Sequence, residues 1–164
     1  MNRRTLLTVA GGGLAALLSG CGAMPSVGGE NAIPAKLAAT PDLSTFAAAV
    51  QAAGLEGRLS GTGPYTVFAP SNAAFARLPR GTLDALMNPA NKARLQAVIL
   101  NHVGRGTFTA SLLKGQKLTL GTLAGPTVVV DGTSGIRIGR AGVVTADIMA
   151  SKGVIHVIDR LLVQ

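Results

Sequence analysis

Three side chains of this sequence have the chemistry of a nucleophile, a base and an acid. Ser71, His102 and Asp147 would form a hydrolytic triad if the fold brought them together. No local motif supports that arrangement, because the chain lacks the G-x-S-x-G turn that presents a nucleophilic serine. It also lacks a G-x-x-x-x-G-K-[ST] phosphate loop, and Thr66 stands where a dinucleotide fingerprint needs its third glycine. We therefore expect a protein that is not an enzyme.

The sequence also offers few residues that could hold a metal or a cofactor. The two histidines, His102 and His156, are 54 positions apart, and the acidic residues show no metal-ligand spacing. The single cysteine excludes a disulfide framework and a cysteine-based zinc site. The sequence thus predicts no cofactor and no metal.

The single cysteine has a different chemistry, set by its neighbours. Leu18-Ser19-Gly20-Cys21 resembles a bacterial lipobox, in which small residues precede a cysteine that receives a diacylglyceryl group. Arg3 and Arg4 precede the apolar stretch Leu6–Leu18, which is shorter than the roughly 20 residues of a spanning helix. These features predict a lipoprotein signal peptide over residues 1–20, with lipid attachment at Cys21. A plain secretory signal with a chance cysteine is the alternative, and the paired arginines leave general or twin-arginine export open.

The residues after this cysteine are rich in glycine, proline and small side chains. We expect residues 21–36 to form a lipidated flexible tether and residues 37–164 to form one domain. The predicted location is the cell envelope, with the protein held on the membrane by its lipid. In a Gram-negative cell it would be outer-membrane or periplasm-facing.

Charge and composition limit the partners. The chain is 48% hydrophobic and 13% charged, which excludes disorder by composition. Without residues 1–20, the basic residues exceed the acidic ones by 13 − 7 = 6. They are scattered along the sequence, and with only 3% aromatic residues we expect no nucleic-acid binding. Two alternatives remain, a solvated basic surface or attraction to anionic envelope polymers or lipid head groups.

Helical signals dominate the first half of the domain. Thr40-Pro41 predicts a helix start, Phe46 and Val50 share its apolar face, and Gly54 ends it. Further helices are predicted after three polar residues that could cap them, Ser71, Thr82 and Asn88. In the last of these, Leu95, Ile99 and His102 fall on one face.

Strand signals dominate the second half. Residues 65–69 have strand composition, and short β-rich segments follow near residues 117–120, 127–131, 136–138, 143–148 and 154–159. Turn residues such as Asp131-Gly132 separate them. Segregation of helices and strands predicts an α+β fold with a largely antiparallel sheet.

Two blocks of residues carry a family resemblance. Gly63–Phe75 is similar to the first signature block of the fasciclin domain family, and Ala146–Leu162 is similar to the second. Leu95–Val103 lies between them, where the family has a Tyr-His motif. The resemblance covers about residues 37–164 and implies a single domain in the form of a β-wedge with helices packed around one side.

The resemblance also implies a function and a set of residues. Family members are exported or surface-bound and act mostly in adhesion, through protein or carbohydrate partners. Positions linked to receptor binding in animal members correspond here to Asn101, His102, Asp147 and Ile148. Asn101 replaces the family's tyrosine and so removes a large amphipathic contact. The other motif positions are expected to be structural: Thr66, Phe68, Pro70, Asn72, Phe75, Gly153, His156 and Asp159.

Several roles stay open at this stage. His102 is either a buried histidine with a hydrogen-bond partner or a binding residue, and Asp147 caps a turn or contacts a partner. The leading functional hypothesis is a non-enzymatic envelope module for adhesion to a cell-surface or matrix protein or an anionic polysaccharide. The alternative is a carrier or sensor of a small apolar ligand.

Overall fold

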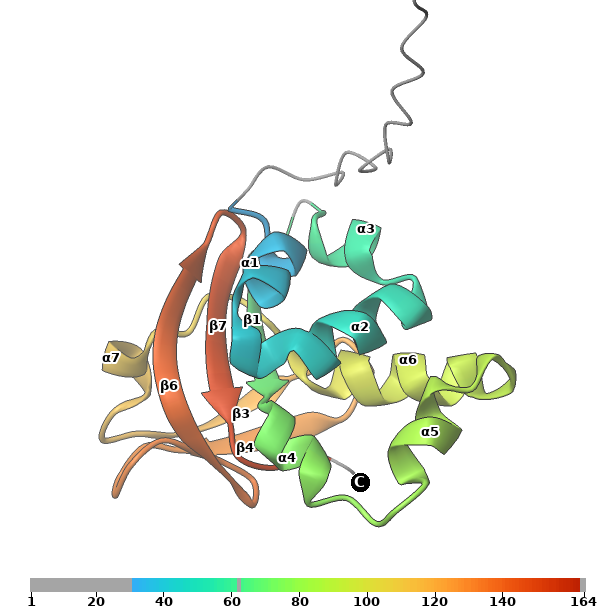
Figure 1. The fold of residues 1–164 in the computed structure, drawn as a ribbon. Helices are drawn as coiled ribbons and strands as arrows, with labels where there is room; N and C mark the ends of the chain where they lie inside the picture. The colour runs from blue at the N-terminus through green and yellow to red at the C-terminus, as the bar shows by residue number, and fades with distance from the viewer. Residues whose placement is uncertain (1–30, 62, 163–164) are drawn as a thin grey trace, which may run out of the picture.

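The computed structural model describes residues 31–61 and 63–162, and its helices precede most of its strands (Figure 1). The α-helices are α1 (Ile33–Ala39), α2 (Ser44–Ala53), α3 (Glu56–Leu59), α4 (Asn72–Ala76), α5 (Thr82–Met87), α6 (Lys92–Asn101) and α7 (Ala110–Leu113). Two 3-10 turns, η1 (Pro41–Leu43) and η2 (Pro89–Asn91), precede α2 and α6. The strands are β1 (Tyr65–Pro70), β2 (Val103–Arg105), β3 (Lys117–Gly121), β4 (Thr127–Asp131), β5 (Arg137–Ile138), β6 (Ala141–Ala150) and β7 (Gly153–Ile158).

The strands form one seven-stranded mixed sheet in the order β2-β1-β7-β6-β5-β4-β3. Every neighbouring pair is antiparallel except β1 and β7, which run parallel with Tyr65 opposite Gly153. An isolated bridge between Gly104 and Thr122 links the region of β2 to the end of β3, so the two ends of the sheet approach each other. The α+β fold with a largely antiparallel sheet is confirmed.

The parallel pair, β1 and β7, is buried on both faces. Val67 and Ile155 point into a core shared with the helices, whereas Phe68 and Ile158 point into a second core within the folded sheet. Burial of both faces explains why these segments read as continuous apolar runs instead of alternating ones. The helices α1, α2 and α6 cover the first face (Figure 1).

Helix ends follow local signals at some positions and depart from them at others. Gly54 adopts a left-handed conformation (φ 69°) and ends α2, and the Ser71 and Asn88 side chains cap α4 and η2. The predicted caps at Thr40 and Thr82 are wrong. The Thr40 hydroxyl donates to the Lys36 carbonyl instead, and Gly81 is the residue that precedes α5.

The expected boundary between tether and domain at residue 37 is also wrong. Helix α1 begins at Ile33, and both Ile33 and Leu37 are fully buried in the helical core. The Asn31 carbonyl accepts a hydrogen bond from the Ser151 amide, between β6 and β7. Packing of two large aliphatic side chains outweighs the glycine- and proline-rich composition around them. The folded part therefore includes residues that we assigned to the tether.

Candidate functional site

The three residues of the hypothetical triad have separate partners. The Ser71 hydroxyl accepts from the Ala74 amide at the start of α4. Both ring nitrogens of His102 are bound elsewhere, and Asp147 lies beside His156, not beside His102. No Ser–His–Asp relay forms among these side chains. In the part of the chain that the structure describes, no three metal-ligating side chains gather either.

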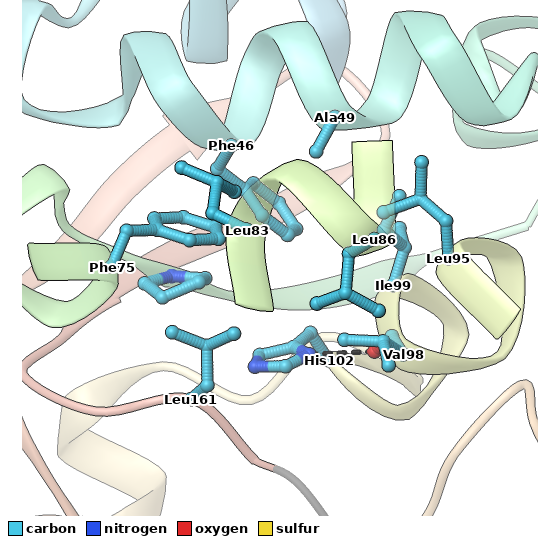
Figure 2. A pocket seen from close by; sticks show the side chains of 11 residues that line it. Phe46, Ala49, Phe75, Leu83, Leu86, Leu95, Val98, Ile99, His102 and Leu161 are labelled. Carbon is cyan, nitrogen blue, oxygen red and sulfur yellow. Dashed lines mark hydrogen bonds between the residues drawn. The ribbon is translucent and has the colours of Figure 1, made fainter. Parts of the chain in front are cut away.

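His102, at the end of α6, joins that helix to the C-terminal segment. Its Nδ1–H donates to the Val98 carbonyl (2.7 Å), and its Nε2 accepts from the Leu162 amide (2.9 Å). Figure 2 shows the ring among apolar side chains, near Leu161, with the bond to Val98 drawn. Phe46 packs against it at 5.9 Å between ring centroids. Complete burial lowers the pKa of His102 to about 4, so the ring is neutral at pH 7.

His156, in β7, has the same role in the second core. Its Nε2–H donates to the Phe108 carbonyl (2.7 Å), and its Nδ1 accepts from the Asp147 amide (3.3 Å). Phe68 stacks on it with centroids 5.8 Å apart and planes 19° apart. Burial is also the main reason that its pKa lies below the ordinary value. The ring thus ties β7 to the irregular middle of β6 and to the segment before α7.

The four positions implied in partner binding do not form one surface. The His102 side chain is completely buried, so the implied contact with a partner does not hold for it. Asn101 is partly buried, and its side-chain oxygen has no hydrogen-bond partner among the described residues. Asp147 is exposed, yet its carboxylate accepts from the Ala110 amide (2.8 Å) at the first turn of α7. Ile148 packs partly against the helical core.

Asp147 therefore makes a long-range cap instead of a local turn. It is the one described non-glycine residue with a positive φ (59°), at a shift in the β6–β7 register. Aspartate is one of the few residues besides glycine that adopt this conformation.

Most of the other motif positions hold the fold together through backbone contacts. The Thr66 hydroxyl donates to Gly106 O (2.7 Å) and accepts from the Phe108 amide (2.9 Å). The Asn72 side chain accepts from the Thr45 amide and donates to the Pro41 carbonyl, which fixes α4 against η1 and α2. Phe68, Pro70 and Phe75 are buried.

Gly153 and Asp159 stand at the two ends of β7. A side-chain carbon on Gly153 would lie 1.7 Å from the Tyr65 carbonyl oxygen, so only glycine fits there. Asp159 accepts from the Gly142 amide (2.7 Å) and pairs with Arg77 (3.3 Å). Cys21 and the predicted signal peptide lie outside the described residues.

Four arginines from three separate segments of the sequence gather on one surface. Arg137, Arg140 and Arg160 line a surface hollow of about 460 Å³, and Arg160 and Arg77 line an adjoining hollow of about 230 Å³. We call these four residues the arginine strip. Sequence reasoning missed it because no spacing in the sequence indicates which loops the sheet brings together.

The strip has little negative charge to neutralise it. Asp159 is the single acidic residue among the residues that line the two hollows. Asp131 stands opposite Arg137 in the β4–β5 pairing. Hydrogen bonds from Thr133, with smaller contributions from Lys117 and Arg137, hold the pKa of Asp131 below its usual value. Four exposed guanidinium groups thus outnumber the nearby carboxylates, and planar guanidinium groups bind carboxylate, sulfate and phosphate oxygens in pairs.

Comparison with known proteins agrees with the fold and the motif blocks. The model of the fasciclin domain family matches residues 41–164. Protein sll1483 of Synechocystis is 43% identical over 120 residues, which cover 73% of this chain and 66% of that protein. Immunogenic protein MPB70 of Mycobacterium bovis is 34% identical over 149 residues, which cover 84% of this chain and 72% of that protein. The chain belongs to the fasciclin domain family.

The fold has a solved counterpart. A pair of such domains from the insect cell adhesion molecule fasciclin I superposes with a TM-score of 0.72 at 18% identity. The match covers 82% of this chain and 51% of the paired structure. The chain spans about half of that structure and about two thirds of sll1483. The shared feature is the wedge of strands with its helical cover.

Proposed function

We propose that this protein is a non-enzymatic adhesion module of the cell envelope that binds anionic polysaccharide through the arginine strip. The observation that carries the proposal is the convergence of Arg77, Arg137, Arg140 and Arg160 on two connected hollows. An extended polyanion can follow such hollows and place successive acidic groups against successive guanidinium groups. Adhesion is the stated role of the insect fasciclin I molecule whose fold this chain shares.

The location proposed for this function is the cell envelope, with the protein held on a membrane by its lipid. Leu18-Ser19-Gly20-Cys21 supports lipid attachment at Cys21 after export. Among the described residues, no helix is long and apolar enough to cross a membrane. A diacylated and N-acylated cysteine would anchor the domain stably, because two or more acyl chains suffice for that.

Retention on an immobilised polyanion tests the binding. The full chain with Cys21→Ser is loaded on heparin and on neutral dextran, and a salt gradient elutes it. We expect retention on heparin alone, and Arg137→Gln/Arg140→Gln should elute at clearly lower salt because two guanidinium contacts are lost.

The control removes the same charge elsewhere. Arg58→Gln/Lys152→Gln changes two exposed cations outside the strip, one in α3 and one in the turn between β6 and β7, at the end of β7 opposite to Arg160. If both double variants shift the elution equally, retention reflects net charge alone and the proposed surface is wrong.

Anchoring has a separate test in the native host. Wild-type protein should sediment with membranes, and Cys21→Ser should be released to the soluble fraction. A Cys21→Ser protein that stays with the membrane would contradict lipid attachment at this residue.

A further inference from the structure

A third hollow, next to the arginine strip, has a different character. It lies between the residues after α4, helix α5, helix α6 and the C-terminal segment, and its volume is about 580 Å³. Small-molecule sites are commonly about 300–1,000 Å³ and mostly apolar. We call it the α5–α6 groove.

The floor of the α5–α6 groove is apolar. Leu78, Ala85, Leu86, Val98 and Leu161 line it. Three of these residues, Leu86, Val98 and Leu161, also line the small void in front of His102 (Figure 2). A single layer of side chains therefore separates the groove from the helical core, and a hydrocarbon chain in the groove would touch apolar atoms along its length.

The rim of the α5–α6 groove is cationic. Arg80 and Arg94 are the only charged residues that line it, accompanied by Thr82 and Asn91. Over residues 31–61 and 63–162 the one ion pair joins Arg77 and Asp159, so neither Arg80 nor Arg94 has a carboxylate partner there. The Asn91 side-chain Nδ2 donates to the Ala85 carbonyl (2.7 Å), which fixes the start of α6 against α5.

This combination selects one kind of occupant. A neutral hydrocarbon would cover the floor but leave two guanidinium groups without an anion. A polysaccharide would pair with the guanidinium groups but leave the apolar floor exposed. A long-chain fatty-acid anion satisfies both, because its tail removes apolar surface from water and its carboxylate accepts bidentate bonds from arginine.

We propose that the α5–α6 groove binds one fatty-acid anion, with the carboxylate at Arg80 and Arg94 and the tail along Leu86, Val98 and Leu161. This site goes beyond the proposed adhesion function and uses different arginines. The two sites are therefore separable by mutation.

Titration calorimetry with dodecanoate tests the proposal on the full chain carrying Cys21→Ser, purified without detergent. We expect saturable binding of one dodecanoate per chain. Butanoate supplies the carboxylate without the tail, and 1-dodecanol supplies the tail without the charge. Both should bind about tenfold more weakly or worse, since each lacks one of the two contributions.

Two variants assign the binding to the groove. Arg80→Gln/Arg94→Gln should weaken dodecanoate about tenfold or more. Ala85→Phe fills the groove without a change in charge, and it should also weaken dodecanoate. Arg137→Gln/Arg140→Gln removes equal charge from the arginine strip and should leave dodecanoate binding unchanged. Unfolding midpoints near that of the parent protein exclude misfolding as the cause.

Several outcomes would overturn the proposal. Absence of saturable dodecanoate binding would do so, as would binding that survives Arg80→Gln/Arg94→Gln. Equal binding of 1-dodecanol would show that the arginines are not used. Binding to phosphatidylglycerol vesicles without binding of monomeric dodecanoate would assign the groove to a membrane surface instead. None of these results affects heparin retention, so this site and the arginine strip can fail independently.

Discussion

The two buried histidines, His102 and His156, use opposite ring nitrogens as hydrogen-bond donor. His102 donates from Nδ1 and accepts at Nε2, whereas His156 donates from Nε2 and accepts at Nδ1. Each ring lies against a phenylalanine, Phe46 at a tilt of 54° and Phe68 at 19°. In both cases a carbonyl fixes the donor nitrogen and a backbone amide uses the other nitrogen. A neutral imidazole therefore links two backbone segments that are distant in sequence, and we call each of the two rings, His102 and His156, a clamp.

The two histidines connect different segments of the chain. His102 attaches the C-terminal segment to α6, and Leu161 of that segment and Val98 of α6 both line the α5–α6 groove. His156 attaches the Asp147 region of β6 and the segment before α7 to the buried strand β7. The first clamp therefore supports a candidate ligand site, and the second supports the sheet.

The largest effect is expected at Phe68, the aromatic partner of His156. Phe68→Ala should lower the free energy of unfolding by about 3–5 kcal/mol, because it opens a cavity against the His156 ring in a fully buried core. Urea denaturation measures the loss. Phe46→Ala is the matched change at His102 and should give a loss of similar size. A small shift of the midpoint in either variant would show that the corresponding ring is not packed as described.

Acid should weaken both clamps. The pKa of His102 falls from 6.5 to about 4 in the fold, so the unfolded chain takes up a proton first as the pH drops. Stability should decrease below pH 6.5 by about 1.4 kcal/mol per pH unit for this ring, to a total of about 3 kcal/mol, and level off below pH 4. The lowered pKa of His156 adds loss in the same direction. Urea midpoints between pH 7 and pH 5 measure this slope, and His102→Gln should reduce it. An unchanged slope would contradict a neutral buried His102.

Removal of one clamp at a time should have local effects. His102→Ala and His156→Ala should each cost about 1–3 kcal/mol, because each leaves a buried carbonyl or amide without its partner. Hydrogen exchange locates the change. His102→Ala should speed exchange at the Leu162 amide, and His156→Ala should speed it at the Asp147 amide. Faster exchange at both amides in either variant would mean that the two clamps are one cooperative unit.

The smallest effect is expected at Asp147, where two variants distinguish its acceptor oxygen and positive φ from its negative charge. Asp147→Ala should cost about 1–2 kcal/mol, because it removes the cap on the Ala110 amide and disfavours the positive φ. Asp147→Asn keeps the acceptor oxygen and tolerates the same conformation, so it should change the unfolding midpoint little. Equal losses in the two variants would point to the negative charge as the important feature.

Local signals in the sequence predicted the elements but not their long-range use. The cap at Ser71, the end of α2 at Gly54 and the strand segments followed from residue types and periodicity. The short strand β2 escaped prediction because Val103-Gly104-Arg105 has no distinctive composition. The start of α1 at Ile33 escaped because its stability comes from burial against other elements, not from its own residues.

The candidate sites were even harder to predict from the sequence, because they depend on contacts between distant segments. The helical face of His102 made burial one of two open interpretations, but its partner Leu162 lies 60 positions away and has no signal of its own. The arginine strip depends on the register of β5, β6 and β7, which places Arg137, Arg140 and Arg160 together. Motif resemblance predicted the family from its two signature blocks, whereas the charged surface arises only from the assembled sheet.

The parallel pairing of β1 with β7 has a consequence for biogenesis. Tyr65 and Gly153 are paired across 88 positions of chain, and the β1–β7 ladder joins the antiparallel β2–β1 pair to the rest of the sheet. A contact between segments this far apart in sequence forms slowly, and β1 cannot pair with β7 until the ribosome has synthesised and released β7. A message truncated before β7 would yield a product with β1 left as an unprotected edge, prone to aggregation and open to proteolysis.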